Sequence, residues 1–132
     1  MAKKKPEVKL RSWGRYTPLD TRSKELPQLI KMTHDIPCEL GVEFGYIANI
    51  RKAKNKKLYY CIYHPDIPDQ EGGVLPPFDG EEYIRQNDWD FFIGDTIWEP
   101  IDNKAGPWRV TLSIDGQMIA DETFNLILPE SC

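Results

Sequence analysis

The sequence lacks a long apolar run, a strongly basic composition and a regular set of cysteines. No uninterrupted apolar stretch approaches the roughly 18 residues of a membrane-spanning helix, so we expect no membrane span and no membrane partner. Its 3 cysteines are odd in number and scattered, unlike the framework of a disulfide-stapled domain. The basic start MAKKKPEVKL is not followed by the apolar segment of a secretion signal. These features predict a protein of the reducing cytoplasm.

Positive charge is also in short supply. The formal net charge is -4, whereas affinity for nucleic acid requires clustered lysine and arginine, so we expect no nucleic-acid partner. One internal basic run, RKAKNKK at residues 51–57, is the exception. Such a run can contact phosphate or an acidic protein surface, but its commoner role is a solvated turn that discourages edge-to-edge aggregation.

Helical patterning is nearly missing as well. The segment SKELPQLIKM hints at a helix, but Pro27 restricts it to a loop or a short helical turn. A chain of 132 residues suits a single domain, which we place at 1–132 with residues 1–7 as a flexible basic N-terminus. An aromatic content of 11% then favours β-structure, because aromatic rings pack well on pleated faces.

Strand patterns fill most of the chain. GVEFGYIANI alternates apolar and polar residues, which predicts a half-buried strand. In LYYCIYH the residues on both sides of an extended strand are apolar. This pattern predicts either a strand covered on both faces or one with an aromatic face and a core face. We expect these two strands to form a hairpin around Asn55. Further strands are predicted at 8–18, 88–100, 106–114 and 117–128. Five to seven strands without βαβ alternation indicate an all-β fold, an antiparallel sandwich or barrel.

A long irregular loop is predicted after the strand that ends at His64 and Pro65. Residues 64–80 are rich in proline, glycine and acids, and a loop of this length usually has a use such as binding. The spacing of these acids matches no calcium-loop template, so we interpret them as solvated charges. We expect the loop to lie at the surface and to be more mobile than the strands.

The C-terminal hairpin turns at Asp115 and Gly116. A two-residue loop would put Phe124 and Trp108 on opposite faces, whereas a three-residue loop with a G1 bulge keeps the apolar set together. Burial therefore predicts the three-residue loop, pairing of Leu112 with Met118, and a positive φ at Gly116. We also expect Trp108, Val110, Leu112, Phe44 and Phe124 to share one core.

Several short motifs in this order resemble a bacterial domain-of-unknown-function family of small immunoglobulin-like β-sandwich proteins. The motifs are Glu43-Phe44-Gly45, His64-Pro65, Trp98-Glu99, Gly106-x-Trp108, Asp115-Gly116 and Phe124, spread over residues 36–128. The resemblance implies a single immunoglobulin-like sandwich and no assigned activity.

Two histidines and two cysteines raise the possibility of chemistry. His34, Cys38, Cys61 and His64 include the ligand types that zinc prefers, and a thiol enzyme would use the same residues. However, Cys61 and His64 point to opposite faces of an extended strand. We therefore predict a buried Cys61 and a His64 that ends the strand, with no cofactor, while a zinc or thiol-dependent enzyme stays open as an alternative.

Tryptophan supports a third hypothesis. The chain has 4 tryptophans, and exposed ones could stack on sugar rings in a carbohydrate-binding module. The alternation of Trp108 with Val110 places that residue in the core instead. Our leading prediction is a non-catalytic module that recognises a protein partner or a second copy of itself through a sheet face or the loop. The predicted interaction surface comprises Asp66, Asp69, Glu71, Phe78, Trp89 and Phe92.

Overall fold

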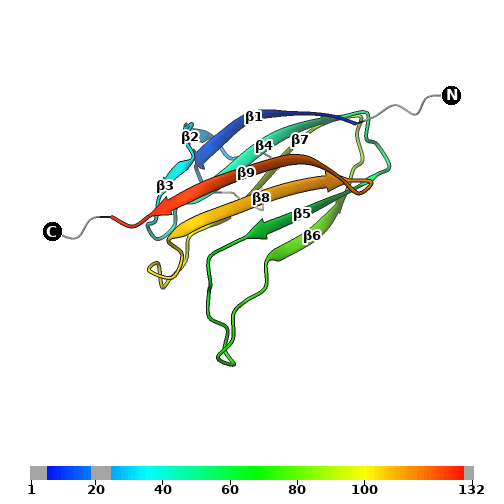
Figure 1. Ribbon diagram of the computed structural model, residues 1–132. Coiled ribbons are helices and arrows are strands. Elements are labelled where there is room, and N and C mark those ends of the chain that lie inside the picture. The colour runs from blue at the N-terminus through cyan, green and yellow to red at the C-terminus, as the bar shows by residue number, and fades with distance from the viewer. Residues whose placement is uncertain (1–5, 19–24, 130–132) are drawn as a thin grey trace.

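The computed structural model describes residues 6–18 and 25–129, and within them nine strands form two packed sheets (Figure 1). The order in the first sheet is β2 (Leu29–Lys31), β1 (Glu7–Tyr16), β4 (Glu43–Arg51) and β7 (Asp88–Thr96). The order in the second sheet is β3 (Asp35–Pro37), β9 (Gln117–Ile127), β8 (Gly106–Ile114), β5 (Lys57–Tyr63) and β6 (Phe78–Tyr83). The predicted all-β sandwich is confirmed, although β3 pairs with β9 in parallel.

Some predicted boundaries need correction. The basic N-terminus was expected to span 1–7, but β1 already begins at Glu7, and residues 1–5 lie outside the described part. No helix occurs in the described residues of the segment 23–32, where β2 forms instead, while 23–24 lie outside. The long loop ends at residue 77, because Phe78–Tyr83 forms strand β6 against β5. Short edge strands such as β2, β3 and β6 carry too few residues to show a clear period.

β4 and β5 do not form the predicted hairpin around Asn55. β4 lies in the first sheet between β1 and β7, whereas β5 lies in the second between β8 and β6. Their connection crosses between the sheets, and the Asn55 amide donates to the Ile84 carbonyl at 2.8 Å. Lys52 likewise donates its amide to Asn87, at 3.0 Å. The apolar side of each strand would be buried equally well if the two strands paired in one sheet or if they lay in opposite sheets. The alternation of apolar and polar residues therefore could not distinguish a hairpin from a crossing between sheets.

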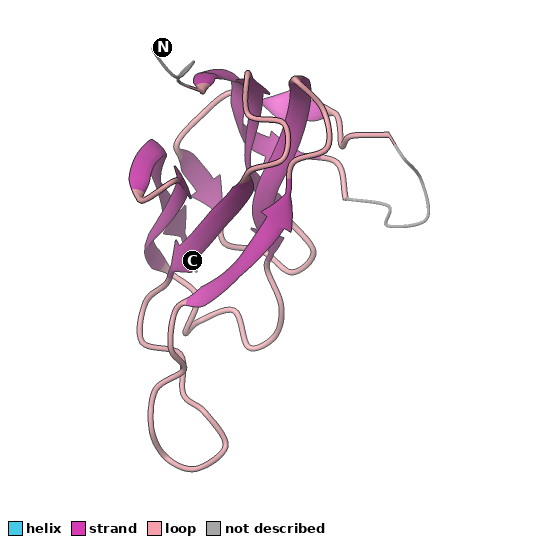
Figure 2. Cartoon of the chain, turned by 90° about the vertical axis from the view of Figure 1, so that its right-hand side faces the viewer, coloured by secondary structure: helices cyan, strands magenta, loops and turns pink. Residues whose placement is uncertain are grey.

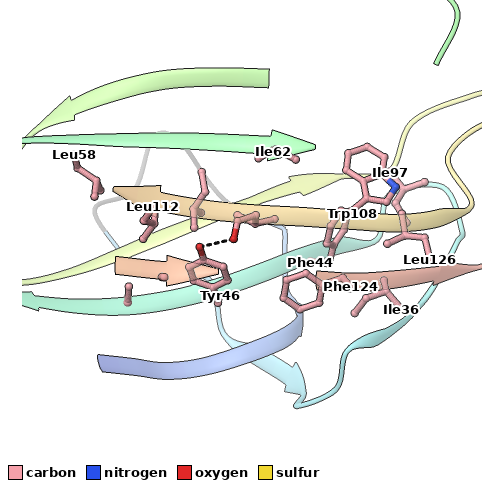
Figure 3. Close-up of a cluster of buried hydrophobic side chains, with 14 of the residues drawn as sticks. Ile36, Phe44, Tyr46, Leu58, Ile62, Ile97, Trp108, Leu112, Phe124 and Leu126 are labelled. Carbon is pink, nitrogen blue, oxygen red and sulfur yellow. Dashed lines mark hydrogen bonds between the residues drawn. The ribbon is translucent and has the colours of Figure 1, made fainter. Parts of the chain in front are cut away.

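The core lies between the two sheets (Figure 3). Trp108, Val110, Leu112, Phe44 and Phe124 are all buried in one cluster, as predicted. The Trp108 ring meets the Phe44 ring edge-on at 5.4 Å, and Phe44 meets Phe124 at 5.8 Å. These contacts join β8, β4 and β9 and so bind the two sheets into one body.

A buried hydroxyl adds a polar link across the core. Tyr46 is fully buried on β4 and donates its hydroxyl to the Val110 carbonyl on β8 at 2.9 Å, the dashed line in Figure 3. Burial raises the pKa of this phenol far above its usual range. The hydroxyl therefore stays protonated and can donate at any ordinary pH.

The turn at Asp115 and Gly116 is not the predicted three-residue loop. Ile114 pairs with Gln117, so two residues make the turn. Asp115 and Gly116 have φ values of 53° and 78°, the two positive values of a type I′ turn. The positive φ predicted at Gly116 is confirmed, but the predicted loop length is wrong.

A bulge further along β9 restores the burial that the turn alone would lose. Ser113 pairs with Met118 and Leu112 with Ala120, so Ile119 is the additional residue. The predicted pairing of Leu112 with Met118 is therefore wrong, and Met118 is exposed instead of facing the core. The inward side of β9 then matches that of β8, as the burial argument required.

Glycines let the middle strands of the first sheet approach closely. Gly14, Gly45 and Gly94 stand side by side on β1, β4 and β7. A methyl group added at Gly45 would lie 2.1 Å from the Ile93 carbonyl oxygen. The φ angle of Gly45, 152°, is also unusual for a residue with a side chain. The Tyr16 hydroxyl meets Ser12 Oγ at 2.8 Å, so the Tyr16 ring extends past Gly14 along the outer side of the sheet.

Candidate functional site

The four candidate metal or thiol residues are dispersed. Cys38 is fully buried, and its thiol donates to the Ile101 carbonyl at 3.3 Å. Cys61 is only half-buried, on the outward side of β5, which corrects the prediction that it is buried. Within the described residues there is no group of three or more histidine, cysteine or acidic side chains arranged to hold a metal ion. Burial raises the pKa of the Cys38 thiol, which disfavours the nucleophilic thiolate.

The two histidines make structural contacts. His34 Nε2 lies 3.1 Å from Glu122 Oε2, and its ring lies between those of Trp13 and Phe124. β5 ends at Tyr63, so His64 and Pro65 follow the strand end as predicted.

Both ring nitrogens of His64 face backbone oxygens. Nδ1 lies 2.6 Å from the Pro65 carbonyl and Nε2 lies 2.9 Å from that of Pro76. The His64 ring also packs against Phe78 at 4.5 Å. The histidine thereby connects the two ends of the long loop.

The long loop projects from one end of the sandwich (Figures 1 and 2). Ile67 anchors it in the core, and Pro68 bridges to Val74. Among the predicted interaction residues here, Asp69 has a turn-forming role, because its Oδ1 accepts from the amides of Glu71 at 2.8 Å and Gly73 at 2.7 Å. Asp66 and Glu71 are both exposed.

Trp108 is 1% exposed and lies in the core, while the other three tryptophans are half-buried. Trp89 packs against Phe91 at 4.9 Å, and Trp98 lies beneath the Lys104 ammonium at 4.4 Å. This arrangement offers no fully exposed indole for the ring stacking that the carbohydrate hypothesis requires.

Tyrosines, rather than tryptophans, occupy the outward side of the second sheet. Tyr59 and Tyr63 on β5 are 45% and 42% exposed, with Cys61 between them, while Leu58 and Ile62 point into the core. LYYCIYH thus has one aromatic face and one core face, the second of the two predicted alternatives. We call the outward side of the second sheet the tyrosine face; it comprises Tyr59, Cys61, Tyr63, Asp79, Glu81, Arg109, Thr111 and Ser113.

A shallow depression of about 440 Å³ lies on the tyrosine face. Its lining includes Tyr59, Cys61, Thr111, Ser113 and, from β6, Asp79 and Glu81. Small side chains flanked by larger ones make the hollow, because Cys61 pairs with Thr111 and Tyr59 pairs with Ser113. The face therefore offers aromatic rings, hydroxyls and carboxylates around one depression.

An ion pair holds one side of the tyrosine face in place. Asp121 on β9 accepts from Arg109 Nε at 2.9 Å and from Nη2 at 2.7 Å. This bidentate contact lowers the pKa of Asp121 and raises that of Arg109. The guanidinium also lies 5.6 Å from the centre of the Tyr63 ring. Arginine and tyrosine are thus presented side by side on the paired strands β8 and β5.

A second hollow lies along one open side of the sandwich, and we call it the edge groove. It has a volume of about 470 Å³ and is lined by side chains that include Tyr60, Ile62 and Phe78 of the second sheet and Phe91, Phe92 and Ile93 of the first. Phe78 and Phe92, predicted as interaction residues from separate segments, both line this groove, but Trp89 is not part of its lining. The carboxylates of Glu82, Asp95 and Glu43 also line the groove.

Lys104 was missed by the sequence analysis. Its side chain is 1% exposed and donates Nζ to the Pro100 carbonyl at 2.9 Å and to Asn103, while its own carbonyl accepts from the Trp108 indole at 2.8 Å. Burial lowers the pKa of this ammonium. A lone lysine in a polar loop carries no sequence signal for burial, so only the fold reveals it.

The basic run 51–57 is largely paired with acids of the same chain. Lys52 contacts Glu7 at 2.8 Å, and Lys57 contacts Glu81 at 3.6 Å. Arg51 and Lys56 contact acids as well. These contacts favour the solvated-turn interpretation over a phosphate site.

Comparisons with known proteins agree with this fold. The family model of a domain of unknown function, DUF3859, matches residues 4–126, a wider range than the resemblance at 36–128. The crystal structure of an immunoglobulin-like protein from Pseudomonas aeruginosa is similar, with a TM-score of 0.71 and 17% identity over 92% of this chain and 97% of that chain. At this identity the likeness shows an immunoglobulin-like fold. No match was found among curated proteins. Within the described residues, no helix is long and apolar enough to cross a membrane.

Proposed function

The chain belongs to the DUF3859 family of domains of unknown function, and we propose that it is a non-catalytic binding module that recognises a protein surface. The proposed binding site is the tyrosine face. The observation that carries this proposal is the exposure of Tyr59 and Tyr63 on a rigid central strand, beside a depression.

The chemistry of the tyrosine face suits protein recognition. Tyrosine and arginine dominate the binding energy of many interfaces because they combine large apolar area with hydrogen-bonding groups. Arg109 is already held by Asp121, so little side-chain freedom is lost when a partner binds. Met118, 55% exposed, lies 3.9 Å from Arg109 through its sulfur and extends the surface with an adaptable side chain.

The partner is either a second copy of the chain or another protein, and the first experiment distinguishes these. Sedimentation velocity of the full chain over a wide concentration range measures self-association directly. A Tyr59→Ser/Tyr63→Ser variant should abolish any dimer, whereas Leu40→Ser, a substitution at a 60% exposed apolar residue outside this face, should leave it intact.

If the chain is monomeric, a photo-crosslinker placed at Ser113 on the same face tests for a different protein. We expect a crosslinked partner that purified protein binds with micromolar or better affinity, and we expect the double tyrosine variant to weaken this binding at least about tenfold. Equal binding by the wild type and the double variant would refute the proposed face. Stoichiometric zinc in the purified protein would instead favour the enzyme alternative.

A further inference from the structure

The edge groove lies between two strands that each pair on one side. Within the described residues, β6 pairs with β5 and β7 pairs with β4, so both are the last strands of their sheets. A link at residues 84–87 joins them, and the groove is lined from both strands. The open side of the sandwich therefore presents two rows of backbone amides and carbonyls along an apolar hollow.

β7 is the better template for an added strand. It has 9 residues, compared with 6 in β6, and its edge is therefore longer than many complete strands in globular proteins. Phe91 and Ile93 line the groove from its inner side, and Phe92 lines it from its outer side. A strand added beside β7 could place alternate side chains into the hollow toward Phe78 and Tyr60.

Negative charge surrounds this apolar lining. The Glu82 carboxylate is exposed at the groove, and that of Asp95 is half-buried within it. Among the described residues, neither carboxylate forms an ion pair, and the lining of the groove contains no lysine or arginine. Burial raises the pKa of Asp95, and the Thr96 amide that donates to this carboxylate offsets the effect only in part, so a cation beside Asp95 would stabilise its charged form.

The same charges disfavour a second copy of the chain as the occupant. Pairing of β7 with another β7 would bring acids of the two copies into one sheet, since this strand carries Asp95, which has no ion pair within the described part of the chain, along with Asp88 and Asp90, which contact Arg51 and Arg11. β6 carries Asp79, Glu81 and Glu82, so pairing between two copies of β6 meets the same repulsion. Like charges across neighbouring strands are destabilising, whereas lysine or arginine opposite these acids is favourable.

We propose that the edge groove binds an extended segment of a partner protein that presents apolar residues and a lysine or arginine on the same face of the strand, since Asp95 shares the inward side of β7 with Phe91 and Ile93. The segment adds to the free edge of β7, its apolar side chains enter the groove, and a cationic side chain reaches the carboxylates of Glu82 and Asp95. This site is separate from the tyrosine face, and neither proposal depends on the other.

Nuclear magnetic resonance of the isotope-labelled full chain tests the proposal with a capped nine-residue peptide of alternating threonine and valine in which the last valine is replaced by lysine, so that the valines and the lysine share one face. We expect amide shifts confined to β6, β7 and the link between them. A peptide with glutamate in place of lysine should cause no such shifts. The affinity for the lysine peptide should fall at least about tenfold in a Glu82→Gln/Asp95→Asn variant, because both carboxylates lose their charge.

Two matched variants serve as controls. Glu39→Gln/Glu71→Gln removes the same number of charges at exposed positions elsewhere and should change the affinity less than about twofold. Tyr59→Ser/Tyr63→Ser should also retain peptide binding, which separates this proposal from that for the tyrosine face. The groove variant should remain folded, because the side-chain amide oxygen introduced by Asp95→Asn can still accept the Thr96 amide that now donates to Asp95 at 2.8 Å.

Several results would overturn the proposal. These are the absence of β7 shifts at millimolar lysine peptide, equal binding of the glutamate peptide, or equal losses in the groove and control variants. Concentration-dependent shifts of β7 amides without any peptide would assign the groove to a second copy of the chain instead.

Discussion

Replacing Trp108 with alanine should remove a large part of the stability of the domain. The side chain is 1% exposed, contacts the rings of Phe44, His64 and Trp98, and donates its indole N–H to Lys104. Truncation of a buried tryptophan to alanine costs about 3–5 kcal/mol, because a cavity remains after the apolar contacts are lost. A chain of 132 residues has an unfolding free energy of about 7–20 kcal/mol, so the variant should fold but be much weakened.

Urea unfolding followed by far-ultraviolet circular dichroism measures this loss. With a slope of about 2 kcal/mol per molar urea, the midpoint should fall by about 2 M. Trp108→Phe provides a matched comparison, since it keeps an aromatic ring but leaves the Lys104 carbonyl without its indole donor, and should cost about 1–2 kcal/mol. A loss below about 1 kcal/mol for the alanine variant would contradict the assignment of Trp108 as the centre of the core.

Three further predictions concern backbone approach, a buried hydroxyl and a half-buried acid. Gly45→Ala should destabilise far more than Gly41→Ala, because a methyl at Gly45 meets backbone whereas one at Gly41 meets open space; similar urea midpoints for the two variants would refute this. Tyr46→Phe should cost about 1–2 kcal/mol by removing the hydroxyl donor to a carbonyl on β8, and an unchanged melting curve would show that the bond contributes nothing. Because the pKa of Asp95 is raised, the folded state keeps the proton on this carboxyl to a higher pH than the unfolded state does. The contribution of Asp95 to the free energy of unfolding therefore falls as the pH rises from the unfolded pKa through the folded pKa. Asp95→Asn should therefore stabilise the protein at neutral pH and show little difference at a pH below the ordinary carboxyl value of about 3.9; equal effects at both would show that the pKa is not raised.

The candidate surfaces were only partly predictable from the sequence. The aromatic face of LYYCIYH was one of two open alternatives, because a strand with apolar residues on both sides does not reveal which side is covered. Phe78 and Phe92 were both predicted as interaction residues, but that they line one groove depends on β6, whose first residues were interpreted as loop. Asp69 was selected as a surface charge and instead organises a turn.

Local sequence by itself determined the all-β class, the inward side of β4 and β8, and the end of β5 just before His64 and Pro65. These features depend on neighbouring residues, since side chains alternate along a strand and proline cannot donate to a sheet. Tertiary structure decided the rest. It placed β4 and β5 in opposite sheets, moved the bulge of the last hairpin to Ile119, and left β6 and β7 as the edges of the groove. The physical reason is that an apolar stripe specifies that a face must be covered, but several partners can cover it, and only packing of the whole chain selects among them.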